Sequence, residues 1–385
     1  MFTRRALALL CAPLAGALLL AACGDDDSSA DPTTTAAEAD AASAGSGSLK
    51  GICPDNVVIQ TDWFATPERA AAYQLIGPDG EIDTSKGAYT GPLGDTGVNA
   101  EIRFGGSYIG FAPIPQQMYT DESIMLGLVA TDDAVAAYEK YPTKAVVAPL
   151  DLNPQTIMFD PATYDISSWD DVADTKATVI YIEGLPFMDY LVSKGYIDES
   201  QLDPSFDGTP SRFIAGDGKI ITQEYGTNEY RWEHDYEGWD RPVKSLLVND
   251  SGYQIYPQGY AVRADELEDN SECLKALVPI IQQAQIDYVK DPKPINDTII
   301  RIADEIKEGP TFSPEGNEAA TQALLDMKIV GNGTNDVFGD FDMDRVKDTI
   351  EVLRPIYAAR DQQIPADLAP EDFVTNEYID TTIKL

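Results

Sequence analysis

The sequence predicts an α/β protein built from two lobes. At 385 residues the chain is too long for one ordinary domain, and two domains of half that length can each bury a core. Residues 57–73 have the pattern of a buried strand, a short loop and a helix, and residues 176–187 repeat that order. Strands that alternate with helices are typical of α/β folds.

The first of these units contains a candidate binding site. Val57 to Gln60 suit a strand covered on both faces, and Thr66-Pro67-Glu68 predicts a helix start with a capping hydroxyl. Between them lie Asp62, Trp63 and Phe64. Aromatic side chains at the carboxyl end of a strand, beside the N–H groups of a helix, are found where open α/β sheets bind small ligands. The alternative is that Trp63 is simply a core residue.

A second strand is expected at residues 99–104, and a glycine-rich loop follows it. This loop has neither the Walker A pattern nor GxGxxG, so it does not indicate a nucleotide site. It suits a ligand held close to backbone amides, with an aromatic wall; a plain strand-to-helix turn is the alternative. The candidate residues of this loop are Gly105, Gly106, Ser107 and Tyr108.

Prolines mark the passage into the second lobe. Pro149, Pro154 and Pro161 interrupt regular structure after an apolar, extended run. Strands at 243–248 and 254–262 then lead back to the first lobe. We therefore expect residues 51–148 to form the first part of lobe 1, residues 149–250 to form lobe 2, and residues 251–385 to return to lobe 1 and form the C-terminal helices.

A strand at 219–225 leads into a second aromatic segment. Residues 224–232 contain three aromatic side chains, two acids, an amide and a guanidinium. Amphipathic rings with hydrogen-bonding groups suit a polar aromatic ligand, so Glu224, Asn228 and Tyr230 are candidate site residues. The alternative is an ordinary helix in which Tyr230 and Trp232 only pack.

The N-terminus predicts export and a lipid anchor. Arg4 and Arg5 precede an apolar run, residues 6–20, that is too short to span a bilayer and is typical of a signal peptide. The run ends in Leu20-Ala21-Ala22-Cys23, which resembles the bacterial lipobox. Residues 1–22 are therefore expected to be the signal peptide and Cys23 the lipidated residue, which anchors the protein to the outer side of the cell membrane.

Residues 23–50 are rich in Asp, Ala, Ser, Thr and Gly. Such a segment cannot bury enough apolar surface to fold, so it is expected to be a disordered tether between the membrane and the folded body.

Charge and residue counts exclude several classes of function. A formal net charge of −38 repels phosphate backbones, so nucleic acid is not expected as a partner. Cys53 and Cys273 are the cysteines left outside the leader and the lipobox, and outside the cytoplasm two thiols predict one disulfide. His234 is the single histidine, which argues against a His-rich zinc site and a Ser-His-Asp triad. No catalytic residue, metal or cofactor is expected.

Helices are expected in the C-terminal part at 272–289, 296–307 and 344–357. Acids at residues 340, 342, 344 and 351 imitate a calcium loop, but Arg345 stands where that loop requires glycine. Capping of the helix at 344–357 explains these acids more simply.

Several of these segments together resemble an ABC-transporter substrate-binding lipoprotein, of the family that includes carriers of thiamine pyrimidine precursors, nitrate, sulfonates and taurine. The resemblance implies the type II periplasmic-binding-protein fold, a venus flytrap of two α/β lobes joined by two crossover strands. It also implies a monomer that binds a small molecule in the interlobe cleft and presents it to membrane permease subunits. The segments that carry it are Thr61-Asp62-Trp63, Gly105-Gly106 with Tyr108 to Phe111, Phe206-Asp207-Gly208, Gly226 to Tyr230, and Asp372 to Asp380.

The resemblance also implies roles for the candidate residues. Asp62 and Trp63 match the family's first binding loop, with Trp63 stacking on a ligand ring. Residues 105–108 match the second loop, and residues 224–230 match the acidic and aromatic segment of the far lobe. Two departures are a longer connection between Gly77 and Gly97, and the pair Arg231-Trp232, which has no counterpart.

Acids and rings in these loops favour a neutral or cationic nitrogen heterocycle, such as an aminopyrimidine. The alternative is an organic anion such as a sulfonate, taurine or nitrate. An anion needs a cation in the cleft, for which only Arg231 and Arg103 are placed. A surface-attached enzyme is a third alternative, disfavoured because no nucleophile and base pair is evident.

Overall fold

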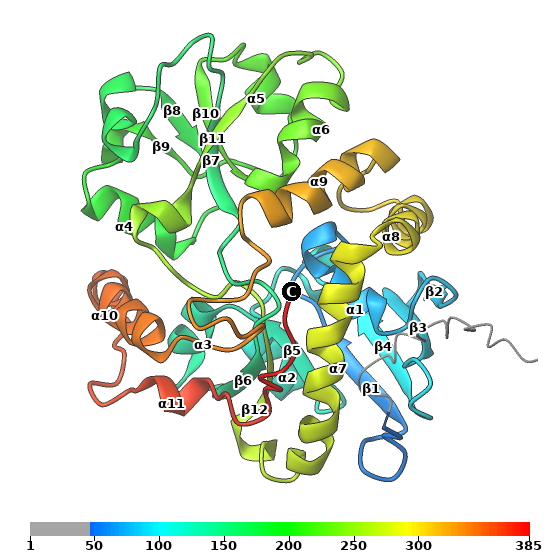
Figure 1. Ribbon diagram of the computed structural model, residues 1–385. Helices are drawn as coiled ribbons and strands as arrows, with labels where there is room; N and C mark the ends of the chain where they lie inside the picture. The colour runs from blue at the N-terminus through cyan, green and yellow to red at the C-terminus, as the bar shows by residue number, and fades with distance from the viewer. Residues whose placement is uncertain (1–46) are drawn as a thin grey trace, which may run out of the picture. The chain divides into compact units, whose positions relative to one another are not determined.

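The computed structural model describes residues 47–385, which belong to one compact unit (Figure 1). The predicted signal peptide, Cys23 and most of the predicted tether lie outside the described residues. The folded body begins earlier than residue 51, because Leu49 is fully buried and its N–H donates to the carbonyl of Thr96 at 2.9 Å. Leu49 was expected in the tether; its apolar side chain instead joins the core of the first lobe.

The larger sheet has seven strands in the order β2-β3-β4-β1-β5-β12-β6. Strands β4, β1 and β5 lie side by side and are parallel, and β12 is antiparallel to β5 and β6. The loops that follow β4, β1 and β5 therefore leave the sheet at the same edge. The bounds are β1 (Asn56–Gln60), β2 (Glu81–Asp83), β3 (Ala88–Pro92), β4 (Asn99–Arg103), β5 (Leu126–Val129), β6 (Thr143–Val147) and β12 (Gly259–Arg263).

The long connection between Gly77 and Gly97 contains β2 and β3. These strands form an antiparallel hairpin, and β3 pairs with β4, so the segment extends the sheet at its edge. The buried Tyr89 fixes the start of the hairpin, since its hydroxyl donates to the carbonyl of Gly77 at 2.6 Å and accepts from the N–H of Gly80 at 2.8 Å.

The smaller sheet has five strands in the order β11-β7-β10-β8-β9. The chain passes between the two sheets at residues 148–154 and again at 248–258, so the two-lobed α/β fold with two crossovers is confirmed. Neither passage is itself a strand of a sheet. The bounds are β7 (Gln155–Phe159), β8 (Thr178–Ile180), β9 (Leu202–Asp203), β10 (Ile220–Tyr225) and β11 (Lys244–Leu247).

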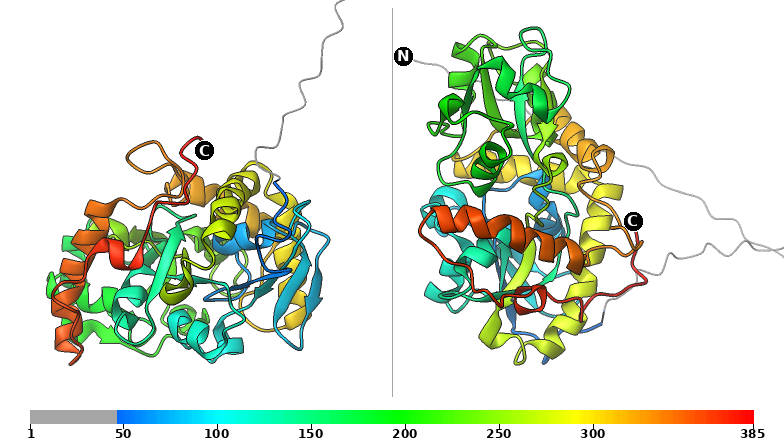
Figure 2. Two further views of the ribbon diagram at one scale, coloured as in Figure 1. Left: turned by 90° about the horizontal axis from the view of Figure 1, so that it is seen from below. Right: turned by 90° about the vertical axis from the view of Figure 1, so that its left-hand side faces the viewer.

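Helices cover both sheets (Figures 1 and 2). Helix α7 packs against α1 and β6, and α10 packs against α3 and α4. The three helices expected in the C-terminal part are present as α7, α8 and α10, whereas α9 was not predicted. The bounds are α1 (Ala70–Gln74), α2 (Ile114–Thr120), α3 (Thr131–Ala137), α4 (Pro186–Ser193), α5 (Ser211–Ala215), α6 (Glu229–His234), α7 (Ser271–Lys290), α8 (Lys293–Ile306), α9 (Pro314–Asp326), α10 (Met343–Ala359) and α11 (Pro370–Phe373).

Two expected helix starts have different outcomes. The side chain of Asp342 accepts from the N–H groups of Asp344 and Arg345, so capping does explain the acids before α10. Thr66 does not cap. The segment Pro67–Arg69 is a 3₁₀ turn (η1) before α1, and the Thr66 hydroxyl instead accepts from the Arg69 guanidinium at 3.1 Å.

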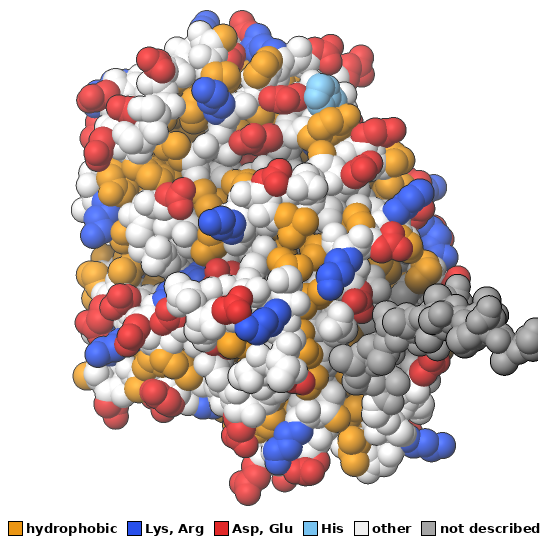
Figure 3. All heavy atoms as spheres, viewed as in Figure 1, with side chains coloured by type: hydrophobic (Ala, Val, Ile, Leu, Met, Phe, Trp, Pro, Cys, Tyr) orange, Lys and Arg blue, Asp and Glu red, His pale blue; other side chains and the backbone are white. Residues whose placement is uncertain are grey.

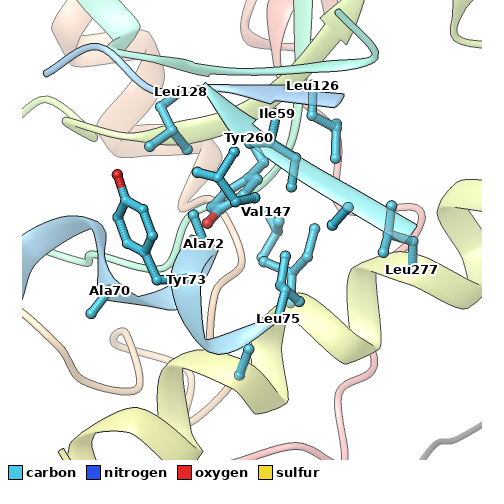
Figure 4. Close-up of a cluster of buried hydrophobic side chains, with 14 of the residues drawn as sticks. Ile59, Ala70, Ala72, Tyr73, Leu75, Leu126, Leu128, Val147, Tyr260 and Leu277 are labelled. Carbon is cyan, nitrogen blue, oxygen red and sulfur yellow. The ribbon is translucent and has the colours of Figure 1, made fainter. Parts of the chain in front are cut away.

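The core of the larger lobe fixes α1 against the sheet (Figure 4). Ile59 of β1 and Leu126 of β5 pack with Ala72 of α1, with Leu75 just after that helix, and with Leu277 of α7. The predicted disulfide between Cys53 and Cys273 is confirmed and ties the segment before β1 to the first turn of α7. Among residues 47–385, no helix has both the length and the apolar character needed to cross a membrane.

Candidate functional site

Three loops meet at the carboxyl edge of the parallel strands. Asp62 and Trp63 follow β1, Gly105 follows β4, and α3 with Asp132 and Asp133 follows β5. This edge of an open α/β sheet is where small ligands bind.

Asp62 is already engaged by a buried arginine. The Arg69 guanidinium is 2% exposed and donates from Nε to Asp62 Oδ1 at 2.8 Å and from Nη2 to Oδ2, whereas the Asp62 side chain is 32% exposed. Burial alone would lower the pKa of Arg69, but the neighbouring Asp62 and Tyr225 raise it above its ordinary value. Arg69 is therefore charged, and Asp62 is the carboxylate that balances it.

Trp63 and Phe64 differ in their surroundings. The indole of Trp63 is partly exposed and meets the exposed ring of Phe111, with 5.6 Å between ring centroids. Phe64 is buried under two glycines, since a Cβ at Gly106 or Gly309 would lie within 2.6 Å of its ring. Trp63 thus faces solvent at the sheet edge, while Phe64 lies in the core.

The glycine loop uses its first amides internally. The N–H of Gly105 donates to the backbone carbonyl of Trp63 at 2.9 Å. The N–H of Gly106 donates to the backbone carbonyl of Asp62 at 3.2 Å. A Cβ at Gly105 would lie 2.2 Å from the carbonyl carbon of Asp62, so glycine is what lets the two loops touch. These two amides are not free for a ligand.

The next two residues of the loop pack against other segments. Ser107 is exposed and its hydroxyl donates to Glu308. Tyr108 lies over Gly87 and edge-on to Phe104, with ring centroids 5.9 Å apart, so its ring covers the end of the sheet where β3 begins and β4 ends.

Two of the candidates that follow the smaller sheet, Glu224 and Asn228, are hydrogen-bonded to each other. Glu224 accepts from the Asn228 amide at 2.9 Å and from the Trp232 indole N–H at 2.8 Å. The Asn228 carbonyl oxygen in turn accepts from Arg231 at 3.1 Å. Tyr230 stands apart from this cluster, with its ring 4.3 Å from that of His234.

The segment after β10 contacts the segment after β1. The Arg69 guanidinium donates to the Tyr225 hydroxyl at 3.5 Å, and the Thr227 hydroxyl donates to the buried carboxylate of Glu68. Helix α9 contacts both η1 and the 3₁₀ turn Gly226–Asn228. The candidate loops of the two lobes therefore face each other.

Two acids at this edge were missed by the sequence analysis. Asp132 is buried and accepts from the Tyr253 hydroxyl at 2.7 Å. Asp133 is open to water, yet desolvation by the surrounding protein and repulsion from Asp132 and Asp62 raise its pKa to about 8. Both follow a buried strand and begin a helix, which is the pattern that identified Asp62 after β1.

These acids do not form a metal centre. In the described part of the chain, no group of three or more His, Cys, Asp or Glu side chains is placed to hold a metal ion.

One open hollow of about 530 Å³ lies elsewhere, against α8. Its lining includes Pro78, Asp291 and Arg301. Pro78 comes after the C-terminal end of α1, whereas the candidate loops lie at the sheet edge where η1 begins. It shares no residue with the candidate loops.

Comparisons with solved structures identify the fold. The alkanesulfonate-binding protein SsuA of Xanthomonas axonopodis pv. citri, bound to MOPS, has a TM-score of 0.52 and 11% identity over 84% of this chain and 98% of its own. For the periplasmic sulfonate-binding protein SsuA of Methylobacillus flagellatus KT, the TM-score is 0.53 with 12% identity, over 84% and 92%. For an ABC transporter protein of Parabacteroides distasonis, it is 0.51 with 11% identity, over 84% and 100%.

No protein-family model matches the chain, and a search of curated proteins finds no match. The structural matches cover nearly the whole of each neighbour and include both lobes. The chain therefore has the two-lobed fold of periplasmic binding proteins.

Proposed function

We propose that this protein is the extracytoplasmic solute-binding component of an ABC importer and captures a small nitrogen heterocycle between its lobes. The observation that carries the proposal is the meeting of two candidate loops, joined by the contact from Arg69 to Tyr225. A ligand at this edge would touch both lobes, so its binding energy would favour the closed state over the open one. The closed form would then dock on the permease as a monomer.

An organic anion is the second candidate, because two of the structural neighbours are sulfonate-binding proteins. An anion would need a cation that has free donors. Arg231 is buried, and its Nη1 and Nη2 groups donate to Asn228, to the Tyr236 hydroxyl and to the Thr311 carbonyl. Within residues 47–385 only its Nε lacks a partner, and that atom is itself buried. Arg103 is paired with two carboxylates. These contacts favour the heterocycle.

A surface-attached enzyme is the least supported alternative. His234 lies on the surface beside Tyr230 and Glu233, and no nucleophile within residues 47–385 forms a hydrogen bond with it. Turnover of a metabolite by the purified protein would revive that alternative.

We expect Trp63→Ala to weaken binding of the natural ligand about fivefold or more, since base-to-aromatic stacking is worth about 1–3 kcal/mol. The ligand would be identified by mass spectrometry of small molecules released from the purified protein, and its affinity measured by calorimetry. Trp63→Phe should retain part of the affinity because it retains a ring.

Tyr141→Ala is a matched control for Trp63→Ala. Tyr141 is also half-buried and pairs with one ring, that of Tyr119 at 5.7 Å, but it precedes β6 and so lies at the opposite edge of the sheet. Equal affinities of wild type and Trp63→Ala for the released ligand would place the ligand elsewhere.

We further propose that Cys23 carries lipid and that residues 24–46 tether the folded body to the cell membrane. Cys23→Ser should move the protein from the membrane fraction to the soluble fraction, because one diacylated cysteine supplies the stable anchor. Immunoblots of fractionated cells and the intact mass of detergent-extracted protein would measure this. Cys11→Ser, inside the predicted signal peptide, is the control, and an unchanged distribution of Cys23→Ser would exclude the anchor.

A further inference from the structure

We propose that the ligand is an organic cation with a flat ring, which lies against Trp63 and Phe111 and places its positive charge beside Asp133. This inference rests on the proposed function and narrows its ligand class. It assigns ligand contacts to two residues, Phe111 and Asp133, that follow β4 and β5 on either side of Trp63.

Phe111 has an unusual position for a large apolar side chain. It is 63% exposed, and its backbone has φ of +57°, in the left-handed region that costs a residue with a Cβ about 1–2 kcal/mol. The turn holds it there, since its N–H donates to the Gly106 carbonyl at 2.9 Å. Its ring is tilted by 49° to that of Trp63. Two partly exposed rings thus form an aromatic surface that a flat ligand would cover.

The charge at this edge calls for a cation. The carboxylate of Asp133 makes no ion pair or hydrogen bond within residues 47–385, whereas both oxygens of Asp132 accept hydrogen bonds. Asp133 is also close enough to Asp62 for the two carboxylates to repel each other. Two guanidinium groups lie at this edge, and both have partners. Arg69 donates to Asp62, Thr66 and Tyr225. Arg360, whose charge acts on Asp132, donates to Asp189 and to the Gly184 carbonyl. A bound cation would stabilise the ionised form of Asp133 over the protonated form that its raised pKa favours, whereas a ligand anion would find no partner there.

A buried hydroxyl beside these acids points independently to a polar ligand group. Tyr73 is fully buried, and its hydroxyl has no hydrogen-bond partner in the described part of the chain. Burial raises the pKa of Tyr73, and Arg69, Thr61 and Asp62 also act on it, so the hydroxyl lies near Thr61 and the ion pair of Arg69 with Asp62. Figure 4 shows it directed away from Leu75 and Leu277. Buried polar groups are normally paired, and because this hydroxyl is fully buried, a ligand amino group would reach it only when the lobes open.

A metal ion does not fit the same position. Both oxygens of Asp132 already accept hydrogen bonds, from the Tyr253 hydroxyl and from the backbone N–H of Asp133. Within the described residues, Asp133 belongs to no group of three or more side chains that could hold a metal ion. The rings of Trp63 and Phe111 would also contribute nothing to a hard cation that prefers oxygen ligands. An organic cation uses both features, because aromatic faces attract positive charge.

The test uses four probes that separate ring from charge: benzylammonium, benzyl alcohol, benzenesulfonate and butylammonium. Calorimetry or ligand-observed NMR would give their dissociation constants with the mature protein at low salt. We expect benzylammonium to bind at least about tenfold tighter than each of the other three, which corresponds to about 1.4 kcal/mol.

Two variants then separate the contribution of the charge from that of the ring. Asp133→Asn should remove the preference for benzylammonium over benzyl alcohol. Phe111→Ala should weaken both benzyl probes about fivefold or more, and leave butylammonium unchanged. Ile52→Ala, another exposed apolar residue at 47%, and Asp297→Asn, an exposed acid of α8, are matched controls that should change nothing.

Failure of this inference can be told from failure of the proposed function. If benzenesulfonate or benzyl alcohol binds as tightly as benzylammonium, and Trp63→Ala abolishes that binding, the cation class is wrong while the binding role stands. If no probe binds and no small molecule is released from the purified protein, both fail. A preference for benzylammonium that persists in Asp133→Asn and Phe111→Ala would overturn the assigned contacts.

Discussion

Asp62→Asn is expected to lower the free energy of unfolding of the ligand-free protein by about 3–5 kcal/mol, because it removes the carboxylate that balances a buried guanidinium. Arg69 is almost fully buried and donates two hydrogen bonds to Asp62. An amide can accept only one of them and carries no charge. Chemical denaturation followed by tryptophan fluorescence would measure the loss, with circular dichroism as a second probe.

Asp297→Asn is the matched control, since it makes the same chemical change in an exposed pair. Asp297 and Lys293 are one helical turn apart on α8, and both side chains are mostly in water. Such pairs contribute about 0.3–0.5 kcal/mol, so this variant should be nearly as stable as wild type. If the two variants lose the same small amount, Arg69 is not dependent on Asp62. The double variant Asp62→Asn/Arg69→Met should recover part of the loss, because the uncompensated charge is gone.

The negative net charge of the protein affects the stability of both asparagine variants. Figure 3 shows Asp and Glu side chains over much of the visible face, with Lys and Arg interspersed. A chain of net charge −38 repels itself at low ionic strength, so each removed carboxylate brings a small general gain in stability. Both asparagine variants receive that gain, and the difference between them isolates the ion pair.

Most of the fold could be predicted from the sequence because apolar periodicity and turn residues mark its elements. β1 and α7 have such patterns, and both were placed within about a residue or two. α9 was missed because the face it buries is partly polar: Asn317 and Thr321 are buried and belong to a hydrogen-bonded network with Tyr288 and Asn296. Periodicity of apolar residues does not mark such a helix.

The candidate site could be predicted only as far as residue types allow. Asp62 and Trp63 were found because they separate a strand from a helix start. The partner of Asp62 could not be predicted, since Arg69 reaches it through a turn. The contact of Arg69 with Tyr225 could not be predicted either, because Tyr225 comes from the other lobe. Likewise the glycines at 105 and 106 were predicted as a loop that holds a ligand close to backbone amides, but these amides bond to carbonyls that only the register of β1 and β4 brings near.

Removing the disulfide with Cys53→Ala/Cys273→Ala is expected to lower the free energy of unfolding by up to about 5 kcal/mol. The bond joins residues separated by 220 positions, and a closed loop of that length restricts the unfolded chain more than a short one does. Both cysteines are buried in the core of the larger lobe, so the double alanine variant also loses some packing. Denaturation curves of oxidised wild type and of the variant would measure the difference.

Reduction of wild type separates the two contributions, because it opens the covalent loop and keeps both sulfur atoms in place. If restriction of the unfolded chain dominates, reduced wild type should lose most of what the double variant loses, and its unfolding curve should return on reoxidation. A reduced protein as stable as the oxidised one would mean that the contacts already hold the segment before β1 against α7. Leu49, buried four residues before Cys53, is the residue that would provide such contacts. Leu49→Ala should therefore be tolerated better in the oxidised protein than in the reduced one, because only the intact bond keeps this segment next to α7 when its packing is weakened.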